Sequence, residues 1–409
     1  MTPNTYWALS SVYFFYFAVL GATNPYWGLY LQSLGFDAKQ IGSLMAVFIA
    51  TKLVAPNLWS YWADQKGAHV SVMRLGAVLT PLCFLTVYLQ QGFWTMALAM
   101  VLYSFFWNAI LPQYEVITLK AIEGREERYS QIRLWGSVGF IVAVAGLGWL
   151  LDQVAVSWLP FSILSVMTFM ALSTLVIPAE KIWLSAEKKI LTPETNRPSA
   201  NIREFGLAES FWLRIKYPPV LIFLLSVVLM QASHGPYYTF FSIYMEEIGY
   251  SRSLIGLLWS LGVMAEVVLF AIMHLLLTRF KPEHLLMLSL VLAAFRWLMV
   301  ALFADQLILL LVSQLLHAAT FGSFHAASIA LVQRFFTGKT AGQGQAIYSS
   351  LGFGLGGALG AWGSGLLWTS IGAQSSYLLA CVVAGFGAVL VFWSLRSHRS
   401  YWVEGKVIN

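Results

Sequence analysis

The sequence predicts an all-α integral membrane protein with twelve transmembrane helices in two pseudo-symmetric bundles of six. Its composition, the length of its apolar runs and an internal repeat predict this fold. Of 409 residues, 59% are hydrophobic and 10% charged, less than half of the roughly 25% charge of soluble domains. Mean hydropathy is +0.71 and aromatics reach 15%, as expected for lipid-facing helices with interfacial aromatic belts. This composition excludes a soluble enzyme, a disordered chain and a disulfide scaffold.

Twelve apolar runs have the roughly 17–25 residues that cross a bilayer. They cover 6–31, 41–62, 70–90, 93–117, 133–151, 157–178, 219–244, 254–277, 285–303, 307–332, 346–371 and 376–395. The first run lacks a basic segment before it and a cleavage site after it, which predicts a retained helix. We therefore expect a six-helix bundle at 1–178, a cytoplasmic linker at 179–218, and a second bundle with a short cytoplasmic tail at 219–409.

The distribution of Lys and Arg predicts the orientation of the spans, because cytoplasmic loops are enriched in these residues. If both termini lie on one side, that side holds twenty of the 24 cations, including seven in the linker. The opposite side holds only Lys39 and Arg252, and Lys52 and Arg296 fall inside spans. Both termini are therefore predicted to be cytoplasmic. This bias explains the net charge of +6, so no nucleic-acid partner is indicated.

The two halves repeat with an offset of 214 residues. Gly35-Phe36, Ile41-Gly42 and Lys52 have the same spacing as Gly249-Tyr250, Ile255-Gly256 and Glu266. A second match pairs 137–140 (SVGF) with 350–353 (SLGF). Parallel six-helix repeats joined by a linker are typical of transporters whose halves rock around a site near the midplane.

Apart from Arg74 and Arg133, which lie near the cytoplasmic ends of their spans, four charged residues lie inside the predicted spans, namely Lys52, Glu115, Glu266 and Arg296. Each costs about 2.5–3.5 kcal/mol at the bilayer centre unless it has a partner or a wet cavity. The repeat makes Lys52 and Glu266 equivalent, so we expect them to face each other across a central cavity. Lys52 would receive an anionic substrate group and Glu266 would carry a proton. The alternative is a Lys52–Glu266 ion pair that only closes the bundle.

Arg296 lies midway along its span and is the expected neighbour of an acid on an adjacent helix. It would adjust the proton affinity of Glu266, or form a purely structural pair with it. His317 and His325 are eight residues apart and share one broad helix face. We expect both to take part in proton coupling, although a histidine in an apolar span is more often a packing residue. Position alone leaves Glu115 open between a cavity and a helix interface.

Two of the spans are interrupted at comparable points. Asn24-Pro25 breaks the first span and is followed by Tyr26 and Trp27; His234 precedes Gly235-Pro236, which is followed by Tyr237 and Tyr238. Proline interrupts helical hydrogen bonding, and interrupted segments in matching halves point to a transport site. We therefore expect Asn24, Trp27, His234 and Tyr237 to contact the substrate.

The segment Ser60–Gly67 (SYWADQKG) resembles the signature between helices 2 and 3 of the major facilitator superfamily, with Ser60 in place of the usual glycine. In that family, the aspartate takes part in a cytoplasmic charge network that holds the outward-open state. The resemblance therefore implies a gating role for Asp64, with Arg74 or Arg133 as its partner.

Glu115, Arg133 and the run Leu134–Gly139 (LWGSVG) resemble the sugar site of lactose-permease-type symporters. With Tyr26-Trp27, Lys52, Leu316-His317 and Phe324-His325, they are similar to the phenylpropionate permease branch. This resemblance implies Glu115, Arg133 and Trp135 as site residues and a place in a bacterial inner membrane. One turn after His317, Thr320 replaces the acid of lactose-type symporters, and 346–371 lack their lysine, so the coupling groups must differ.

These observations predict a proton symporter that takes up a small organic anion, with an aromatic carboxylate as the expected substrate. Glu266, Arg296, His317 and His325 would couple the proton, and Lys52 or Arg133 would bind the carboxylate beside Trp27, Trp135 and Tyr237. A sugar or nucleoside symporter is the main alternative, and an exporter of amphipathic compounds the next. Glu266, His317 and Glu115 remain alternative proton carriers.

No nucleophile motif, metal motif or phosphate loop indicates an enzyme. The sequence predicts no cofactor, and its expected partners are a small molecule, protons and the lipid bilayer, with the protein acting as a monomer. A receptor or scaffold of the same fold is the non-transporting alternative.

Overall fold

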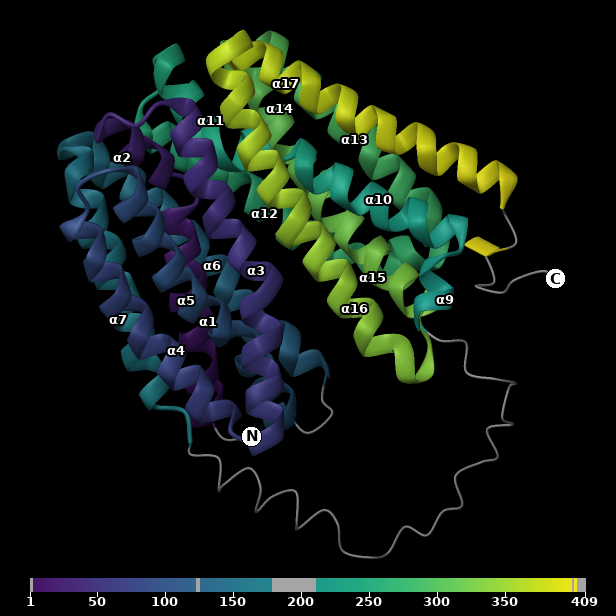
Figure 1. Ribbon diagram of the computed structural model, residues 1–409, viewed down its shortest axis with the longest axis horizontal. Helices are drawn as coiled ribbons and strands as arrows, with labels where there is room; N and C mark the ends of the chain where they lie inside the picture. Colours follow the sequence, from purple (N-terminus) through teal and green to yellow (C-terminus); the bar gives the residue numbers. More distant parts are fainter. Residues whose placement is uncertain (1–2, 123–125, 179–210, 399–400, 403–409) are drawn as a thin grey trace, which may run out of the picture.

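The computed structural model describes residues 3–122, 126–178, 211–398 and 401–402. Most of the predicted linker, including its residues 179–210, lies outside the described part. Two groups of long helices stand side by side (Figure 1). The first contains α1 (Pro3–Thr23), α2 (Trp27–Ser33), α3 (Ala38–Lys66), α4 (His69–Phe84), α5 (Phe93–Ile122), α6 (Glu126–Gln153) and α7 (Leu159–Leu175).

The second group follows the short helix α9 (Phe211–Ile215). It contains α10 (Pro218–Ser233), α11 (Gly235–Ile248), α12 (Arg252–Arg279), α13 (Pro282–Phe303), α14 (Leu307–His317), α15 (Phe324–Phe335), α16 (Ala341–Ser349) and α17 (Gly357–Ser397). We call the two groups the first half and the second half.

Eleven segments of the described chain are long and apolar enough to cross a membrane. The last of them, Gly338–Ser397, has 60 residues and contains Gly372 at φ 81° and ψ 172°. A residue with positive φ ends an α-helix, so this segment contains two spans. With that division the twelve predicted spans are present; the span predicted at 254–277, for example, is α12.

Both predicted interruptions are present as well. Helix α1 ends at Thr23 and α2 begins at Trp27, so Asn24-Pro25 lies between them. Helix α10 ends at Ser233 and α11 begins at Gly235, directly after His234.

The sequence repeat corresponds to repeated packing. Gly35 and Gly249 both have positive φ, 88° and 106°. Gly139 packs on Phe14, and the equivalent Gly352 packs on Val227; both members of the second pair lie 213 residues beyond those of the first. In each half, therefore, the fifth span lies against the first through a glycine.

The halves contact each other through two equivalent helix pairs, α3 with α17 and α12 with α6. Gly42 of α3 faces Ala361 and Gly365 of α17, and the equivalent Gly256 of α12 faces Val144 of α6. A Cβ atom on Gly42 would come within 2.7 Å of the Ala361 carbonyl oxygen and Gly365 Cα. Glycine is therefore required for this close approach of the helices.

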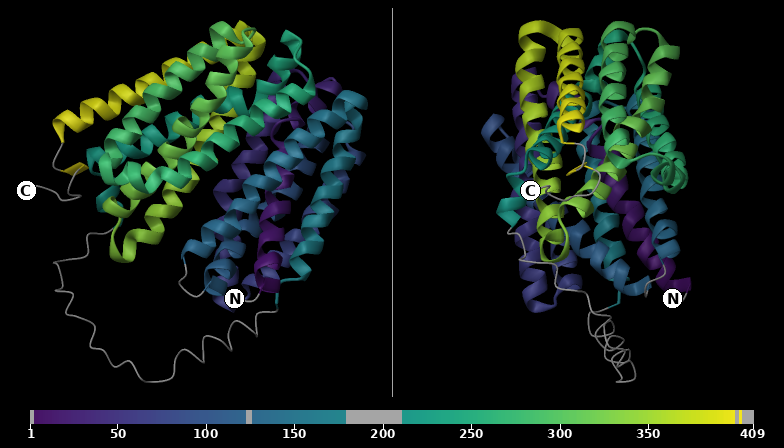
Figure 2. Two further views of the ribbon diagram at one scale, coloured as in Figure 1. Left: turned by 180° about the vertical axis from the view of Figure 1, so that it is seen from behind. Right: turned by 90° about the vertical axis from the view of Figure 1, so that its right-hand side faces the viewer.

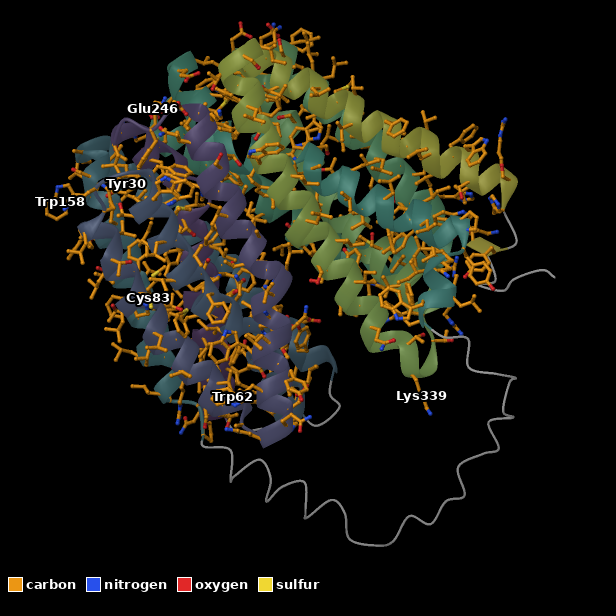
Figure 3. All side chains as sticks on the ribbon, in the orientation of Figure 1. Tyr30, Trp62, Cys83, Trp158, Glu246 and Lys339 are labelled. Carbon is orange, nitrogen blue, oxygen red and sulfur yellow. The ribbon has the colours of Figure 1, made fainter. Side chains whose placement is uncertain are left out.

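These contacts close one end of the molecule. We call the end where α1 and α10 begin the linker end, and the opposite end the far end. Among the described residues, hydrogen bonds between the halves lie at the far end and join Tyr26, Leu151 and Asp152 to Arg252 and Ser253. The ribbons diverge toward the linker end (Figures 1 and 2), where Trp62 and Lys339 mark the tips of the two halves (Figure 3). The structure is therefore closed at the far end.

We predict that Gly139→Ala destabilises the protein by about 1–3 kcal/mol, because its methyl group would overlap the backbone of Phe14. Gly146→Ala is the matched control on the same helix, since no atom lies within 4 Å of the position that its methyl group would take. Alanine there is expected to be neutral or stabilising. Thermal unfolding of the purified variants measures both effects, and equal melting temperatures would contradict the prediction.

Candidate functional site

A buried arginine occupies the centre of the second half. Arg296 of α13 has no exposed surface. Its Nε donates to the Ser313 carbonyl oxygen at 2.9 Å, and its Nη1 lies 3.1 Å from Nδ1 of His317 and 3.3 Å from the Thr320 hydroxyl. Nη2 has no hydrogen-bond partner among the described residues. The charge is thus held by neutral groups of α14 and of the segment that follows it.

His317 links Arg296 to Glu266. A guanidinium group only donates hydrogen bonds, so Nδ1 of a neutral His317 accepts and the ring proton lies on Nε2. Nε2 lies 3.8 Å from the Glu266 carboxylate on α12, which is too long for a hydrogen bond. The structure therefore places the imidazole of His317 between the acid and Arg296, where the sequence predicted direct neighbours.

Aromatic rings surround Arg296. Its guanidinium carbon lies 4.4 Å from the ring centre of Tyr237 and 4.5 Å from that of Trp297, distances typical of cation–π contacts. Tyr237 also donates to Oε1 of Gln314 at 2.9 Å. Tyr237 is buried and contacts both Arg296 and Gln314, and its predicted contact with the substrate stays a prediction.

The helix that carries His317 changes its winding at the site. Residues Ala318–Ser323 form a π-helical segment between α14 and α15. The rings of His317, Phe321 and His325 stack in a column, with centre distances of 5.4 and 6.4 Å. His325 also hydrogen-bonds to the Tyr348 hydroxyl at 2.8 Å. The wider π turn brings these three rings into line, and such turns are frequent at functional sites.

His234 has a fixed tautomer. Its Nδ1 lies 2.8 Å from the Met230 carbonyl oxygen, so the ring proton is on Nδ1. Its Nε2 is buried and has no partner among the described residues, and the ring packs edge-on against Trp297 at 4.8 Å. His234 therefore lies beside Trp297, which itself contacts Arg296. Its Nε2 is a hydrogen-bond acceptor without a described donor.

The first half provides Glu115 on α5 and Arg133 on α6. The Arg133 guanidinium lies over the Phe17 ring at 3.9 Å, and Arg133 interacts electrostatically with Glu115. No direct ion pair joins the two within the described residues. Tyr16 interacts electrostatically with both Glu115 and Arg133. Arg133 thus lies over aromatic rings, those of Phe17 and Tyr13, and has no hydrogen-bond acceptor among the residues that the structure describes.

Arg133 also connects the two halves electrostatically. It interacts with Glu266 and His325 of the second half as well as with Glu115 of its own. Arg133, Glu115, Glu266, His317 and Arg296 therefore form one electrostatically connected set, which we call the central cluster.

Lys52 is not part of the central cluster. It is half-buried near the middle of α3, where its neighbour Leu53 packs against Gly354 of the second half. Within the described part of the chain, Lys52 forms neither a hydrogen bond nor an ion pair, so the alternative of a Lys52–Glu266 ion pair is not formed here. Asn24 forms only a backbone hydrogen bond, to Leu20, as far as the described residues show.

Two tryptophans predicted to contact the substrate pack against other aromatic residues in this structure, and their contact with the substrate stays a prediction. Trp27 is buried against Tyr30, Phe84 and Tyr103. Trp135 donates to the Tyr6 hydroxyl and packs on Trp7. Residues two apart on a helix point in nearly opposite directions, so Trp135 faces away from Arg133.

Asp64 lies at the linker end of α3 and is 69% exposed. Its described partner is His69, at 3.7 Å. Arg74, one of its expected partners, donates instead to the carbonyl oxygens of Thr174, Leu175 and Ile177 at the end of α7. The role of Asp64 in gating stays a prediction.

Sequence reasoning missed Phe321, Tyr348 and Phe353. Phe353 contacts both Phe321 and His325. Helical spacing was an available signal for Phe321, which lies four residues from each histidine, and the SLGF repeat pointed to Phe353. Thr320, noted only as a missing acid, accepts a hydrogen bond from Arg296.

Comparison with known proteins identifies the family. Residues 6–379 match the model described as the MFS_1 like family, that is, the major facilitator superfamily. The chain belongs to this family, and it is a transporter. A "Probable 3-phenylpropionic acid transporter" of Escherichia coli (strain K12) is 28% identical over 384 residues, 93% of this chain and 95% of the relative.

Other proteins similar to the transporter are named for other compounds. A "Maltose permease" of Geobacillus stearothermophilus is 26% identical over 392 residues, 93% of this chain and 92% of the relative. The crystal structure of the nucleoside transporter NupG has a TM-score of 0.79 at 18% identity, and the match covers 96% of this chain and 98% of that one. The shared fold therefore leaves the substrate to the side chains of the site.

The candidate site consists of charged, imidazole and aromatic groups. No group of three or more His, Cys, Asp or Glu side chains in the described residues could hold a metal ion. Arginine and histidine beside carboxylates can bind an anion and move a proton.

We predict that Tyr237→Phe lowers the free energy of unfolding of the transporter by about 1–2 kcal/mol, because Oε1 of buried Gln314 loses its donor. Tyr238→Phe is the control, since its hydroxyl makes no hydrogen bond within the described residues. Thermal unfolding of the two purified variants tests this, and equal losses would contradict the assigned hydrogen bond.

Proposed function

We propose that this transporter is a proton symporter that takes up a small aromatic carboxylate such as 3-phenylpropionate. The observation that carries the proposal is the position of Arg133, a half-buried cation with no described acceptor that interacts with acids of both halves. The relative described as a 3-phenylpropionic acid transporter supports the choice of substrate.

Arg133 is the proposed carboxylate anchor. Its guanidinium presents paired donors that match a carboxylate, and the Phe17 ring beneath it leaves its N–H groups free to bind at the edge. Lys52 is a second cation of the first half and is the alternative anchor. Phe321 and Phe353, which adjoin His325, would contact the apolar body of the substrate.

Glu266 is the proposed proton carrier. When Glu266 is ionised, its charge competes with a substrate carboxylate for Arg133. A proton on Glu266 removes this competing anion, so anion binding and proton binding favour each other. His317, which lies between Glu266 and Arg296, would transmit the change in the charge of Glu266 to Arg296. His325 and Tyr348 would lie on the path of the proton toward the linker end. Thermodynamic linkage requires the coupling to be reciprocal.

In the proposed cycle, the linker end is cytoplasmic and the far end is periplasmic. The excess of Lys and Arg on the linker side supports this orientation. The present structure, closed at the far end, would then be the state that releases substrate to the cytoplasm. Rocking of the halves about the central cluster would expose Arg133 and Glu266 to each side in turn.

A sugar or nucleoside symporter is the second candidate. The proximity of Glu115 to Arg133 favours it, because a carboxylate beside a guanidinium can hold the hydroxyl groups of a sugar. The relatives described as a maltose permease and a nucleoside transporter agree with this alternative. Competition by these compounds against 3-phenylpropionate in a binding assay separates the two.

We predict that Glu266→Gln abolishes proton-driven accumulation of 3-phenylpropionate but preserves exchange, because glutamine imitates the protonated acid. Uptake into proteoliposomes with and without an imposed pH gradient measures this. Asp305→Asn, an exposed acid between α13 and α14, is the control and should behave as the parent. Undiminished accumulation by Glu266→Gln would refute the role of Glu266.

We predict that Arg133→Met weakens 3-phenylpropionate binding by ~30-fold or more, about 2 kcal/mol, since an ion-paired anchor is lost. Lys52→Met should change the affinity less, because it removes a charge that is not the proposed anchor. The uncharged 3-phenylpropanamide should lose little affinity in either variant. Calorimetric titration measures the affinity of each variant for 3-phenylpropionate. A larger loss of affinity in Lys52→Met than in Arg133→Met would show that Lys52 is the carboxylate anchor.

A further inference from the structure

The contact between α6 and α12 at the far end contains a set of polar bonds that the transport site does not use. Asp152, in the last turn of α6, places its carboxylate over the first turn of α12. Oδ1 accepts from the Arg252 backbone N–H at 2.9 Å, and Oδ2 accepts from the Ser253 N–H at 3.0 Å and from the Ser253 hydroxyl. A carboxylate of the first half thus caps a helix of the second half.

The interaction also runs in the other direction. The Arg252 guanidinium donates through Nη1 to the Leu151 carbonyl oxygen in the last turn of α6, at 2.7 Å. Its Nε and Nη2 donate to the Glu246 carboxylate at 3.0 and 2.5 Å, which holds the side chain in place. An anion therefore lies at the start of one helix and a cation at the end of the other, and both arrangements are stabilised by the helix dipoles.

The equivalent contact between α3 and α17 is built differently. Repeat symmetry pairs Ser251, the N-cap of α12, with Asp37, the N-cap of α3. Asp37 accepts from Gln40 of its own helix at 2.7 Å, and the described contact across the halves there is glycine packing, at Gly42 and Gly365. Of the two equivalent contacts, the one between α6 and α12 carries the described cross-half bonds to charged groups.

We propose that Asp152 and Arg252 form a latch that holds the far end closed, so that their bonds set the balance between the state seen here and the state open at the far end. The bonds to N–H groups of α12 and to a carbonyl of α6 must break when the halves separate. Single exposed ion pairs contribute little, but here five bonds join the two halves at the helix ends. The latch rests on the rocking motion of the proposed function and is independent of its substrate and proton.

Distance measurement between spin labels tests the latch on the full-length protein. Cys83 and Cys381 are replaced by alanine, and label pairs are introduced at exposed positions of the two halves. Gln91→Cys with Ser370→Cys reports on the far end, and Lys66→Cys with Lys339→Cys reports on the linker end. Neither substrate nor a pH gradient is added, so a failure of the proposed function leaves the result interpretable.

Asp152→Ala and Arg252→Ala are each expected to lengthen the far-end distances and shorten the linker-end distances. The ratio of far-end-open to far-end-closed molecules should rise by ~tenfold, as expected for losing hydrogen bonds to a charged group. Asp37→Ala is the matched control, because it removes an equivalent cap that acts within one half, and its distributions should equal those of the parent. Asp152→Asn, which conserves shape, provides a second variant if the alanine variant does not fold.

Unchanged distance distributions in the folded Asp152 and Arg252 variants would overturn the latch. Equal shifts in Asp37→Ala and Asp152→Ala would also overturn it, because the effect would then come from helix capping in general.

Discussion

The need to satisfy a buried guanidinium determines the construction of the second half. Arg296 lies midway along a membrane-spanning helix with no exposed surface, where an isolated charge is costly. The Ser313 carbonyl, the His317 imidazole, the Thr320 hydroxyl and two aromatic rings surround it. These groups come from α11, α13, α14 and the π-helical segment, so the position of one charge fixes how these helices pack.

The two halves treat their arginines differently. Arg296 is enclosed and hydrogen-bonded, whereas Arg133 stands against an aromatic ring without a described acceptor. Under the proposed function the two arginines have different roles. Arg296, which is already hydrogen-bonded, holds the coupling histidine His317, whereas Arg133 is available to bind a substrate anion. Glu266 lies between the two, within reach of His317 and of the field of Arg133.

The contacts between the halves also differ in their chemistry. Glycines allow α3 to approach α17 and α12 to approach α6, so backbone meets backbone and two rigid surfaces can rock without repacking large side chains. Polar bonds at the far end are added to one of these two contacts. Although the helices of the two halves are related by the repeat, these bonds can therefore favour the state open at the linker end over the state open at the far end.

Much of this architecture was accessible from the sequence. Apolar runs predict the spans because a bilayer requires each backbone to satisfy its hydrogen bonds within a helix, and the GF, IG and SVGF matches predict which helices are equivalent. Scarcity of charge made Lys52, Glu115, Glu266 and Arg296 recognisable. What the sequence could not determine was which of these charges meet. Helical periodicity places His317 and His325 about 80° apart, but a π-helical segment aligns them with Phe321. The bonds of Asp152 to Arg252 and Ser253 join residues about a hundred positions apart, and the inward or outward direction of Trp135 depends on how α6 rotates against α1. Such choices are made by packing between helices, which only the tertiary structure decides.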